Sequence, residues 1–349
     1  MSVNELSSSP EASAYRVVVT DLLPPSLEWE RQILGDLAEL EACQAASEDD
    51  LSDSIAEADA VMVYHTIRIT EKTIRKLKKC RLIVRCGVGF DNVDHAFARE
   101  RGIPVANVPD YGTEEVADSA IGLMLAMTRG INRLNSRLRN GVEPWSYTPV
   151  TPLHRLRGRQ FSVVGLGRIG TAAAMRAKAL GMQVSFYDPY KADGYDKALG
   201  LRRVETLEEL LETAAVLSMH CPLTVETKAM IGEKTIGQMP RGAYLVNTAR
   251  GGVVDTRAIP DAIASGQLAG AGLDVLEQEP PAADDPLLIA WRDPNHPAYD
   301  RVILNSHTAF YSEEGLLDMR RKGTETCRRA LLGLPLRNIV NGVILGGSE

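Results

Sequence analysis

A glycine-rich turn supplies the first residues whose types and spacing indicate chemistry. Gly165, Gly167 and Gly170 follow the apolar run Gln160–Val164 and open the Ala-rich segment Thr171–Leu180, so the turn joins a predicted strand to a predicted helix. In such a turn the first glycine permits a tight bend, the second lets the backbone approach a pyrophosphate, and the third allows the helix to pack against the strand. Unpaired amides at the helix N-terminus then face the anion. A glycine-rich turn without a ligand has the same composition, so the motif alone leaves dinucleotide binding open.

An aspartate at the end of the next predicted strand complements this turn. Asp188 follows Met182–Tyr187, at the position where a carboxylate accepts hydrogen bonds from both ribose hydroxyls of adenosine. A negative charge there repels a 2′-phosphate. We therefore expect the chain to bind NAD(H) rather than NADP(H).

A histidine and an arginine stand just past two other predicted strands. His307 follows Val302–Asn305, and Arg250 follows Ala243–Thr248. Sites in α/β proteins are assembled at this edge of the sheet. Imidazole can exchange a proton near neutral pH, and a planar guanidinium suits a carboxylate together with the adjacent carbonyl oxygen. The alternatives are a structural histidine and a surface salt bridge.

The elements that would position these residues form two blocks. In the first block, short β-branched runs alternate with polar helix-like segments, which implies a parallel sheet with helical crossovers. The same alternation restarts at Gln160, after a looser stretch that contains glycine and prolines. The predicted strands are Tyr15–Thr20, Ala60–His65, Leu82–Cys86 and Ile103–Val108 in the first block, and Gln160–Val164, Met182–Tyr187, Val216–Cys221, Ala243–Thr248, Ala269–Val275 and Val302–Asn305 in the second.

Two helical segments lie outside this alternation. The segment 113–127 is apolar nearly all round until Arg129, so it must be covered on most faces, either between domains or between subunits. We interpret it as a homodimer contact, with burial inside one chain as the alternative. The second segment, Glu313–Leu334, closes the chain. The long Pro-rich loop between Glu279 and His307 is compatible with a role in the site and with a passive surface insertion.

Length and composition limit the class of protein. With 349 residues the chain exceeds the roughly 250–300 residues at which single cores stop growing, so we expect two domains. A net charge of −7 argues against a chain that mainly grips nucleic-acid phosphates. The five cysteines form no CxxC pair, which argues against a disulfide framework and a metal site. Residues 1–14 lack the pattern of a signal peptide, and no apolar stretch reaches about 18 residues. We expect a cytoplasmic protein that contacts neither membrane nor nucleic acid.

Longer motifs make the chain similar to a known family. It resembles the D-isomer-specific 2-hydroxyacid dehydrogenases over nearly its whole length, and within them the C-terminal-binding-protein (CtBP)-like branch. The motifs that carry the resemblance are RCGVGFDN at 85–92, VP at 108–109, GLGRIG at 165–170, YDPY at 187–190, HC at 220–221, VNTARGG at 246–252, GLDVLEQEP at 272–280 and HTAFYS at 307–312.

The resemblance implies an NAD-dependent oxidoreductase that interconverts a small 2-oxo acid and its D-2-hydroxy acid. In this family hydride passes between nicotinamide C4 and substrate C2, while His307, paired with Glu279, exchanges the proton and Arg250 binds the substrate carboxylate. No metal is implied. The resemblance also implies cofactor contacts from Gly165, Gly167, Arg168, Ile169, Gly170, Asp188, Cys221, Pro222, Thr224, Thr248, Ala249 and Asp274, and substrate contacts from Arg85, Gly87, Val88, Gly89 and Phe310.

Two positions depart from the family pattern and leave the acid unidentified. Ser306 precedes the histidine where many relatives have proline, and Phe310 stands where the CtBP-like branch has tryptophan near the substrate.

The resemblance implies a fold of two Rossmann-like, doubly wound parallel-sheet α/β domains with a cleft between them. Residues 1–111 and 309–349 would form a discontinuous, flavodoxin-like substrate domain, and residues 112–308 an NAD-binding Rossmann domain. A rival interpretation is an NAD(H)-sensing, CtBP-like transcriptional regulator with weak or no turnover. The intact set of His307, Glu279 and Arg250 weighs against that rival.

Overall fold

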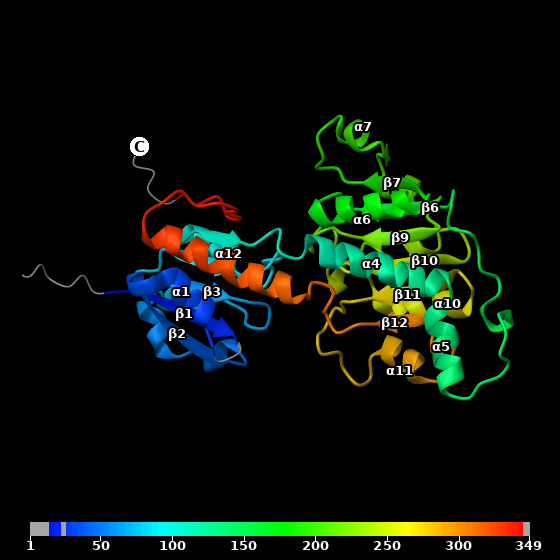
Figure 1. Cartoon of the computed structure of the whole chain (residues 1–349), viewed down its shortest axis with the longest axis horizontal. Helices are drawn as coiled ribbons and strands as arrows, with labels where there is room; N and C mark the ends of the chain where they lie inside the picture. Colours follow the sequence, from blue (N-terminus) through cyan, green and yellow to red (C-terminus); the bar gives the residue numbers. More distant parts are fainter. Residues whose placement is uncertain (1–13, 22–25, 345–349) are drawn as a thin grey trace, which may run out of the picture. The chain divides into compact units, whose positions relative to one another are not determined.

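The chain divides into two compact units. The computed structural model describes residues 14–21 and 26–344. One unit comprises Met1–Tyr111 and Glu313–Glu349, and the other comprises Gly112–Ser312 (Figure 1). Residues 1–13, on which the expectation of a chain without a signal peptide rests, lie outside the described residues.

A five-stranded sheet forms the centre of the first unit. All its ladders between named strands are parallel. The strand order β2-β1-β3-β4-β5 is that of flavodoxin-like folds. The strands are β1 (Tyr15–Asp21), β2 (Ala38–Ala45), β3 (Ala60–Val63), β4 (Leu82–Arg85) and β5 (Val105–Asn107).

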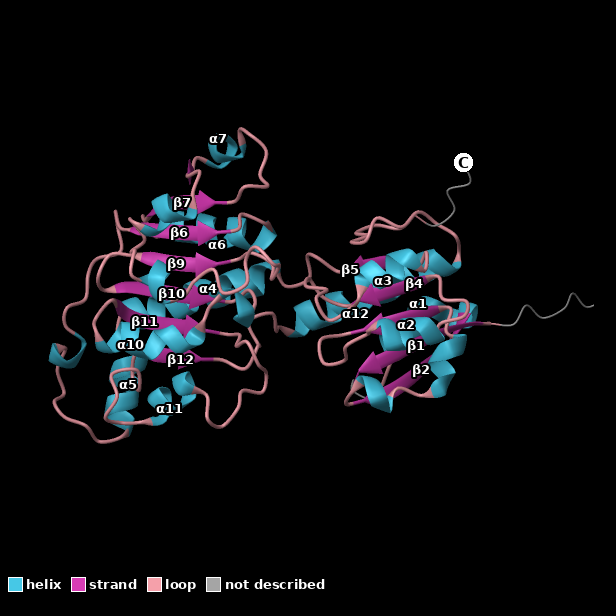
Figure 2. Cartoon of the chain, turned by 180° about the vertical axis from the view of Figure 1, so that it is seen from behind, coloured by secondary structure: helices cyan, strands magenta, loops and turns pink. Residues whose placement is uncertain are grey.

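Helices cover both faces of this sheet. Successive valines of β1 point to opposite faces, as the two-residue period of a strand requires, so Val17 and Val19 belong to one apolar cluster and Val18 to the other. The first cluster lies under α1 (Glu28–Leu34) and the C-terminal helix α12 (Glu313–Leu331), as Figure 1 shows. The second lies under α2 (Glu71–Lys76) and α3 (His95–Glu100), which face the viewer in Figure 2.

A buried ion pair ties α12 to the first unit. The Arg320 guanidinium donates to both carboxylate oxygens of Glu30, each at 2.7 Å, and also to the carbonyl of Ser26 at 3.1 Å. The Glu30 side chain is fully buried and that of Arg320 is 10% exposed. Because breaking the pair would leave a buried charge without its partner, this bidentate contact fixes how the end of the chain docks on α1.

A seven-stranded parallel sheet forms the centre of the second unit. Its order, β12-β11-β10-β9-β6-β7-β8, is the dinucleotide-fold order extended by one strand. The direction of strand addition reverses between β6 and β9. The strands are β6 (Gln160–Val164), β7 (Gln183–Tyr187), β8 (Arg202–Arg203), β9 (Val216–Met219), β10 (Ala243–Asn247), β11 (Leu268–Leu273) and β12 (Val302–Leu304).

Helices cover both faces of the second sheet as well. On the face turned to the viewer in Figure 1 lie α4 (Thr113–Thr128), α5 (Ile131–Arg139) and α6 (Arg168–Ala179). The opposite face carries α8 (Leu207–Leu211), α9 (Glu233–Ile236), α10 (Ile259–Ala264) and α11 (Pro286–Arg292), while α7 (Tyr195–Leu199) follows β7.

The apolar helix α4 packs inside the second unit. It contacts α6, β10 and β11. Met124 is fully buried in the same apolar cluster as Phe161 of β6 and Val246 of β10. The sheet of the same unit therefore covers much of the apolar surface of α4. The homodimer contact stays a prediction.

The predicted α/β class is confirmed, and the predicted strands match the observed ones to within a few residues. The strands β2 and β8 and the helix α11 were not anticipated. Residues 309–312, which the sequence placed with the first domain, lie in the second unit. The physical reason is that Ala309 N–H donates to the carboxylate of Asp274 and its carbonyl accepts from Ser119 Oγ.

Replacing Arg320 with methionine should lower the free energy of unfolding by about 3 kcal/mol, because it leaves the Glu30 carboxylate buried and unpaired. Arg321→Met, at an exposed position of the same helix, is the matched control and should change it by less than about 0.5 kcal/mol. Denaturant unfolding of both variants measures the difference. Equal stabilities would show that the pair does not hold α12 in place.

Candidate active site

Three neighbouring strands of the second sheet end beside one another and carry polar residues just past their ends. The parallel register pairs Val246 of β10 with Gly272 of β11, and Leu273 of β11 with Leu304 of β12. The segments that follow these strands therefore start at the same edge of the sheet. They contribute Arg250, Asp274 with Glu279, and His307.

The structure brings His307 and Glu279 within hydrogen-bond distance of each other, and their acid–base role stays a prediction. His307 Nδ1 lies 2.7 Å from Glu279 Oε2. The other carboxylate oxygen, Oε1, accepts the backbone N–H of Leu276 at 2.9 Å. The Phe310 ring meets the imidazole edge to face, with 6.4 Å between the ring centroids. Both side chains of the pair keep partial exposure, 28% for His307 and 36% for Glu279, so the imidazole can be reached from outside the unit.

The surroundings favour the charged form of Glu279. Burial raises the pKa of its carboxyl group, but four influences outweigh burial and lower the pKa overall: the hydrogen bond and the charge of His307, the amide of Leu276, and the positive charge of Arg250. The geometry thus gives a carboxylate–imidazole pair suited to donate or accept a proton.

The backbone around His307 is fixed by a buried aspartate. The Asp274 carboxylate is 2% exposed and accepts the N–H groups of Thr308 and Ala309 at 3.0 Å. His307 itself has a positive φ of 56° and donates its N–H to the Asp274 carbonyl at 2.8 Å. A non-glycine residue adopts such a φ only where its surroundings enforce it. In this structure Asp274 therefore orients the histidine, and its expected contact with the cofactor stays a prediction.

A turn stabilised by an asparagine side chain holds the backbone at Arg250. Asn247, the last residue of β10, is fully buried; its Oδ1 accepts from Ala249 N–H at 3.0 Å and its Nδ2 donates to the Arg250 carbonyl at 2.9 Å. Arg250 Nη1 donates to the Ala249 carbonyl at 2.8 Å. Sequence reasoning assigned no role to Asn247, although asparagine after a strand is a known signal for a side-chain-stabilised turn.

The glycine turn has the geometry that a dinucleotide requires. Gly165 has a φ of +88°, and a side chain there would meet the backbone of His220 and Cys221. A Cβ on Gly170 would overlap the carbonyl oxygen of Gly165. At Gly167, by contrast, a Cβ would meet no atom within 4 Å, so the space beside it is open to a ligand. Helix α6 begins immediately after Gly167, with Arg168 and Ile169 in its first turn.

The other expected cofactor contacts surround this turn. Asp188 Oδ2 accepts Leu166 N–H at 2.8 Å and Oδ1 accepts Tyr190 N–H at 3.0 Å, which leaves a lone pair on each oxygen for a ribose hydroxyl. At the end of β9, Pro222 and Thr224 form a turn with Thr227, whose hydroxyl donates to the Pro222 carbonyl at 2.6 Å and accepts from Thr224 N–H at 2.8 Å. Burial raises the pKa of the neighbouring Cys221 thiol to about 11, so this side chain is a neutral wall.

Two buried polar atoms at the same edge have no hydrogen-bond partner within residues 14–21 and 26–344. They are Thr248 Oγ1 and His220 Nδ1. Burial lowers the pKa of His220 to about 4, so that imidazole is neutral at pH 7 and cannot substitute for His307 as an acid. An open glycine turn, a hydroxyl-binding carboxylate and a hydroxyl without a partner together fit a bound NAD(H).

Four of the residues expected to contact the substrate, Arg85, Gly87, Val88 and Gly89, lie together in the first unit. Arg85 ends β4, is 7% exposed, and donates from Nη1 to the Cys86 carbonyl at 3.3 Å. The loop that follows, 87–89, is held by Asn107, whose Nδ2 donates to the Val88 carbonyl at 2.7 Å, and by Val108, whose N–H donates to the Gly87 carbonyl at 3.1 Å. The loop is thereby ordered by the end of β5.

The part of the chain that the structure describes holds no cluster of three or more histidine, cysteine, aspartate or glutamate side chains placed to bind a metal ion. None of its helices combines the length and the apolar character needed to cross a bilayer.

Comparison with known proteins gives the family. Residues 121–309 match the model of the D-isomer-specific 2-hydroxyacid dehydrogenase NAD-binding domain. The chain is 40% identical over 261 residues to a glyoxylate reductase of Korarchaeum cryptofilum, covering 74% of this chain and 76% of that protein. It is 35% identical over 326 residues to a D-3-phosphoglycerate dehydrogenase of Methanocaldococcus jannaschii, covering 93% of this chain but only 59% of that relative's length.

Solved structures agree with this assignment. The D-lactate dehydrogenase of Aquifex aeolicus, determined with NAD and lactic acid, superposes with a TM-score of 0.82 at 29% identity, covering 95% of this chain and all of that one (100%). The chain therefore belongs to the D-isomer-specific 2-hydroxyacid dehydrogenase family and is an NAD(H)-binding oxidoreductase of that family. The finer likeness to the CtBP-like branch and the cytoplasmic location stay predictions.

The glycine turn yields a prediction that separates packing from ligand binding. Gly170→Ala should lower the free energy of unfolding by about 2 kcal/mol, since the new methyl group overlaps the Gly165 carbonyl.

Gly167→Ala should leave the free energy of unfolding within about 0.5 kcal/mol of wild type, because no protein atom lies within 4 Å of the new methyl group. It should nevertheless weaken NADH binding by about 10-fold, since its methyl group stands where the backbone must approach the pyrophosphate. Denaturant unfolding and NADH fluorescence titration measure the two quantities; unchanged affinity in Gly167→Ala would contradict the assignment.

Proposed function

We propose that this protein reversibly reduces a small 2-oxo acid to its D-2-hydroxy acid with NADH. The single observation that carries the proposal is the His307–Glu279 pair, 2.7 Å apart, within the electrostatic reach of Arg250. Reducing a carbonyl needs a proton donor at its oxygen and a cation that holds the neighbouring carboxylate. These three side chains provide both.

His307 is the proposed proton donor for reduction and acceptor for oxidation. Its Nδ1 is engaged by Glu279, which leaves Nε2 as the nitrogen that exchanges the proton with the substrate oxygen. Glu279 fixes the orientation of the ring and stabilises its protonated state. Asp274 and the amides of Thr308 and Ala309 hold the backbone of the histidine, so the ring does not have to be ordered during the reaction.

Arg250 is the proposed substrate anchor. Its planar fork can bind a carboxylate oxygen and polarise the adjacent carbonyl. The Asn247 side chain and the Ala249 carbonyl hold the turn from which it extends. By resemblance, Arg85 and the amides of 87–89 bind the substrate carboxylate, and Phe310 limits the room for the substrate side chain. These roles make the first unit the substrate domain.

The proposed cofactor contacts lie around the glycine turn. The amides that follow Gly165 and Gly167 would bind the pyrophosphate, and Asp188 the adenosine ribose. Cys221, Pro222, Thr224, Thr248 and Ala249 would line the dinucleotide. When bound, NADH supplies the hydride that adds to C2 of the substrate.

The test is an NADH-oxidation screen over glyoxylate, hydroxypyruvate, pyruvate and bulkier 2-oxo acids, with NADPH compared. Glyoxylate and pyruvate are included because similar proteins are a glyoxylate reductase and a D-lactate dehydrogenase. We expect turnover that prefers NADH. His307→Gln should lower kcat by about 10²- to 10⁴-fold, and Arg250→Gln should lower kcat/KM by about 10²-fold.

His154→Gln serves as the matched control, because this exposed histidine lies outside the site and should leave turnover unchanged. Full activity in His307→Gln would contradict the role of His307 as the proton donor and acceptor. NADH binding without turnover on any 2-oxo acid would instead favour the NAD(H)-sensing regulator.

A further inference from the structure

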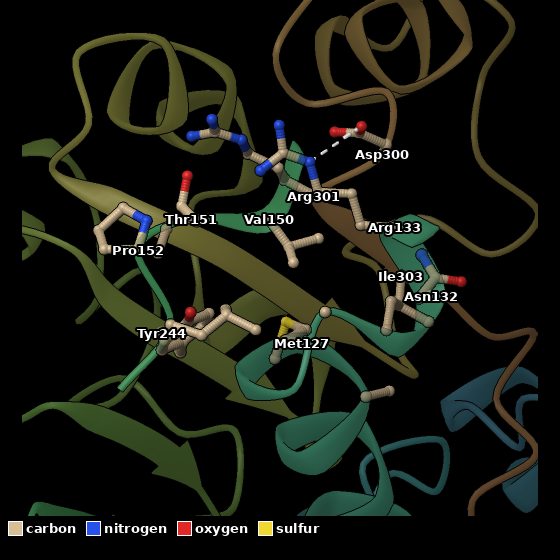
Figure 3. A pocket seen from close by; sticks show the side chains of 14 residues that line it. Met127, Asn132, Arg133, Val150, Thr151, Pro152, Tyr244, Asp300, Arg301 and Ile303 are labelled. Carbon is tan, nitrogen blue, oxygen red and sulfur yellow. Dashed lines mark hydrogen bonds and ion pairs between the residues drawn. The ribbon is translucent and has the colours of Figure 1, made fainter. Parts of the chain in front are cut away.

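A cavity of about 100 Å³ lies at the other end of the three strands that carry the site. Its lining includes Tyr244 and Ala269, near the starts of β10 and β11, and Arg301, which precedes β12. The end of α4, the start of α5 and the segment 150–153 complete the wall (Figure 3). Arg250, Asp274 and His307 follow the opposite ends of the same strands, so the cavity is separate from the proposed active site.

The cavity carries an excess of positive charge. The guanidinium groups of Arg133 and Arg301 lie side by side at its rim in Figure 3, and each charge is felt by the other. The charges of Arg129 and Arg159 also reach Tyr244 in the wall. The carboxylate that faces these groups is Asp300, which pairs with Arg133 at 3.0 Å. For a chain whose net charge is −7, this is a strong local reversal of sign.

Arg301 is held charged in a place that disfavours its charge. Burial, and then the neighbouring Arg133, lower the pKa of its guanidinium. Its side chain makes no hydrogen bond or ion pair with any residue in 14–21 and 26–344. Asp300, the ion-pair partner of Arg133, is also mostly buried, since 14% of its side chain is exposed. Placing a partly buried guanidinium beside a second positive charge costs free energy, and a bound anion would offset that cost.

The remaining wall limits the anion by size and chemistry. Thr151 and Asn132 add polar side chains at the rim, while Met127, Val150 and Ile303 provide apolar surface. A volume of about 100 Å³ exceeds the roughly 10–15 Å³ that a single water molecule needs, so the cavity has room for several water molecules or a compact ion. Two guanidinium groups and one carboxylate line this space, and a compact tetrahedral oxyanion can offer acceptor oxygens to both guanidinium groups at once.

We propose that this cavity binds a phosphate group, from inorganic phosphate or from a small phosphate ester, through Arg133 and Arg301. Arg301 supplies a guanidinium group that makes no ion pair within the described part of the chain, although the charge of Asp300 acts on it. Arg133, which Asp300 orients, supplies the second guanidinium. The phosphate is a ligand at the amino ends of β10, β11 and β12 and not a substrate at their carboxyl ends.

The test is calorimetric titration of the NAD⁺-saturated protein with inorganic phosphate and, separately, glycerol 3-phosphate at constant ionic strength. Saturation with NAD⁺ blocks the glycine turn, the other place in the chain expected to bind phosphate. We expect saturable binding of at least one ligand, about 10-fold weaker or more in Arg301→Gln. If the ester binds more tightly than inorganic phosphate, its carbon chain contacts the apolar wall. If the two bind equally, the cavity recognises the phosphate group alone. Both results support the site.

Stability distinguishes a binding arginine from a structural one. Without phosphate, Arg301→Gln should keep or raise the wild-type melting temperature, because it removes a charge that burial and Arg133 oppose. The rise in melting temperature that phosphate produces in wild type should be lost in this variant. Arg202→Gln, an exposed arginine of β8 at the far edge of the same sheet, is the control and should respond like wild type. No saturable binding to wild type, or equal binding to Arg301→Gln, would overturn the proposal.

Discussion

The buried carboxylate of Asp274 fixes the segment on which His307 stands, and the candidate site depends on that interaction. Burial raises the pKa of Asp274, and the amides of Ala309 and Thr308 act against this rise by hydrogen-bonding to the carboxylate. The aspartate lies between the other two elements of the site because β11 is the strand between β10 and β12. Its N–H donates to the carbonyl of Asn247, the last residue of β10, at 2.9 Å, so the position of the histidine is tied to the end of the sheet.

The same strand order links the remaining groups. The segment after β11 continues through Leu276, whose N–H holds one oxygen of Glu279 while His307 holds the other. The turn after β10 approaches this segment closely, since a side chain on Gly251 would overlap the backbone of Leu276. Arg250 is therefore brought near Glu279 by backbone packing, which explains why its charge contributes to lowering the pKa of that carboxyl group. An acidic protein can attract an anionic substrate because the positive charge is local.

Sequence patterns were sufficient where the local signal and the final structure coincide. The β-branched runs predicted the buried strands, and the glycine turn predicted the junction of β6 with α6. They failed where a segment gains its structure from neighbours: β2 reads AELEACQA, an edge strand without a β-branched residue that forms by pairing with β1, and β8 is only two residues long. Residues 309–312 were misplaced because the hydrogen bonds to Asp274 are set by the tertiary fold. No spacing in the sequence relates Arg133 to Arg301, which α5 and the start of β12 bring to one cavity.

The central claim is that His307 and Glu279 act as one proton-transferring unit, and a double-mutant cycle tests it most directly. The measurement is kcat/KM for 2-oxo acid reduction by wild type, His307→Gln, Glu279→Gln and the double variant. The account predicts strong non-additivity: once His307 is removed, removing Glu279 as well should lower kcat/KM by no more than a few-fold, because the carboxylate acts only through the imidazole. If the two losses multiply, Glu279 acts independently of His307, and the account is wrong.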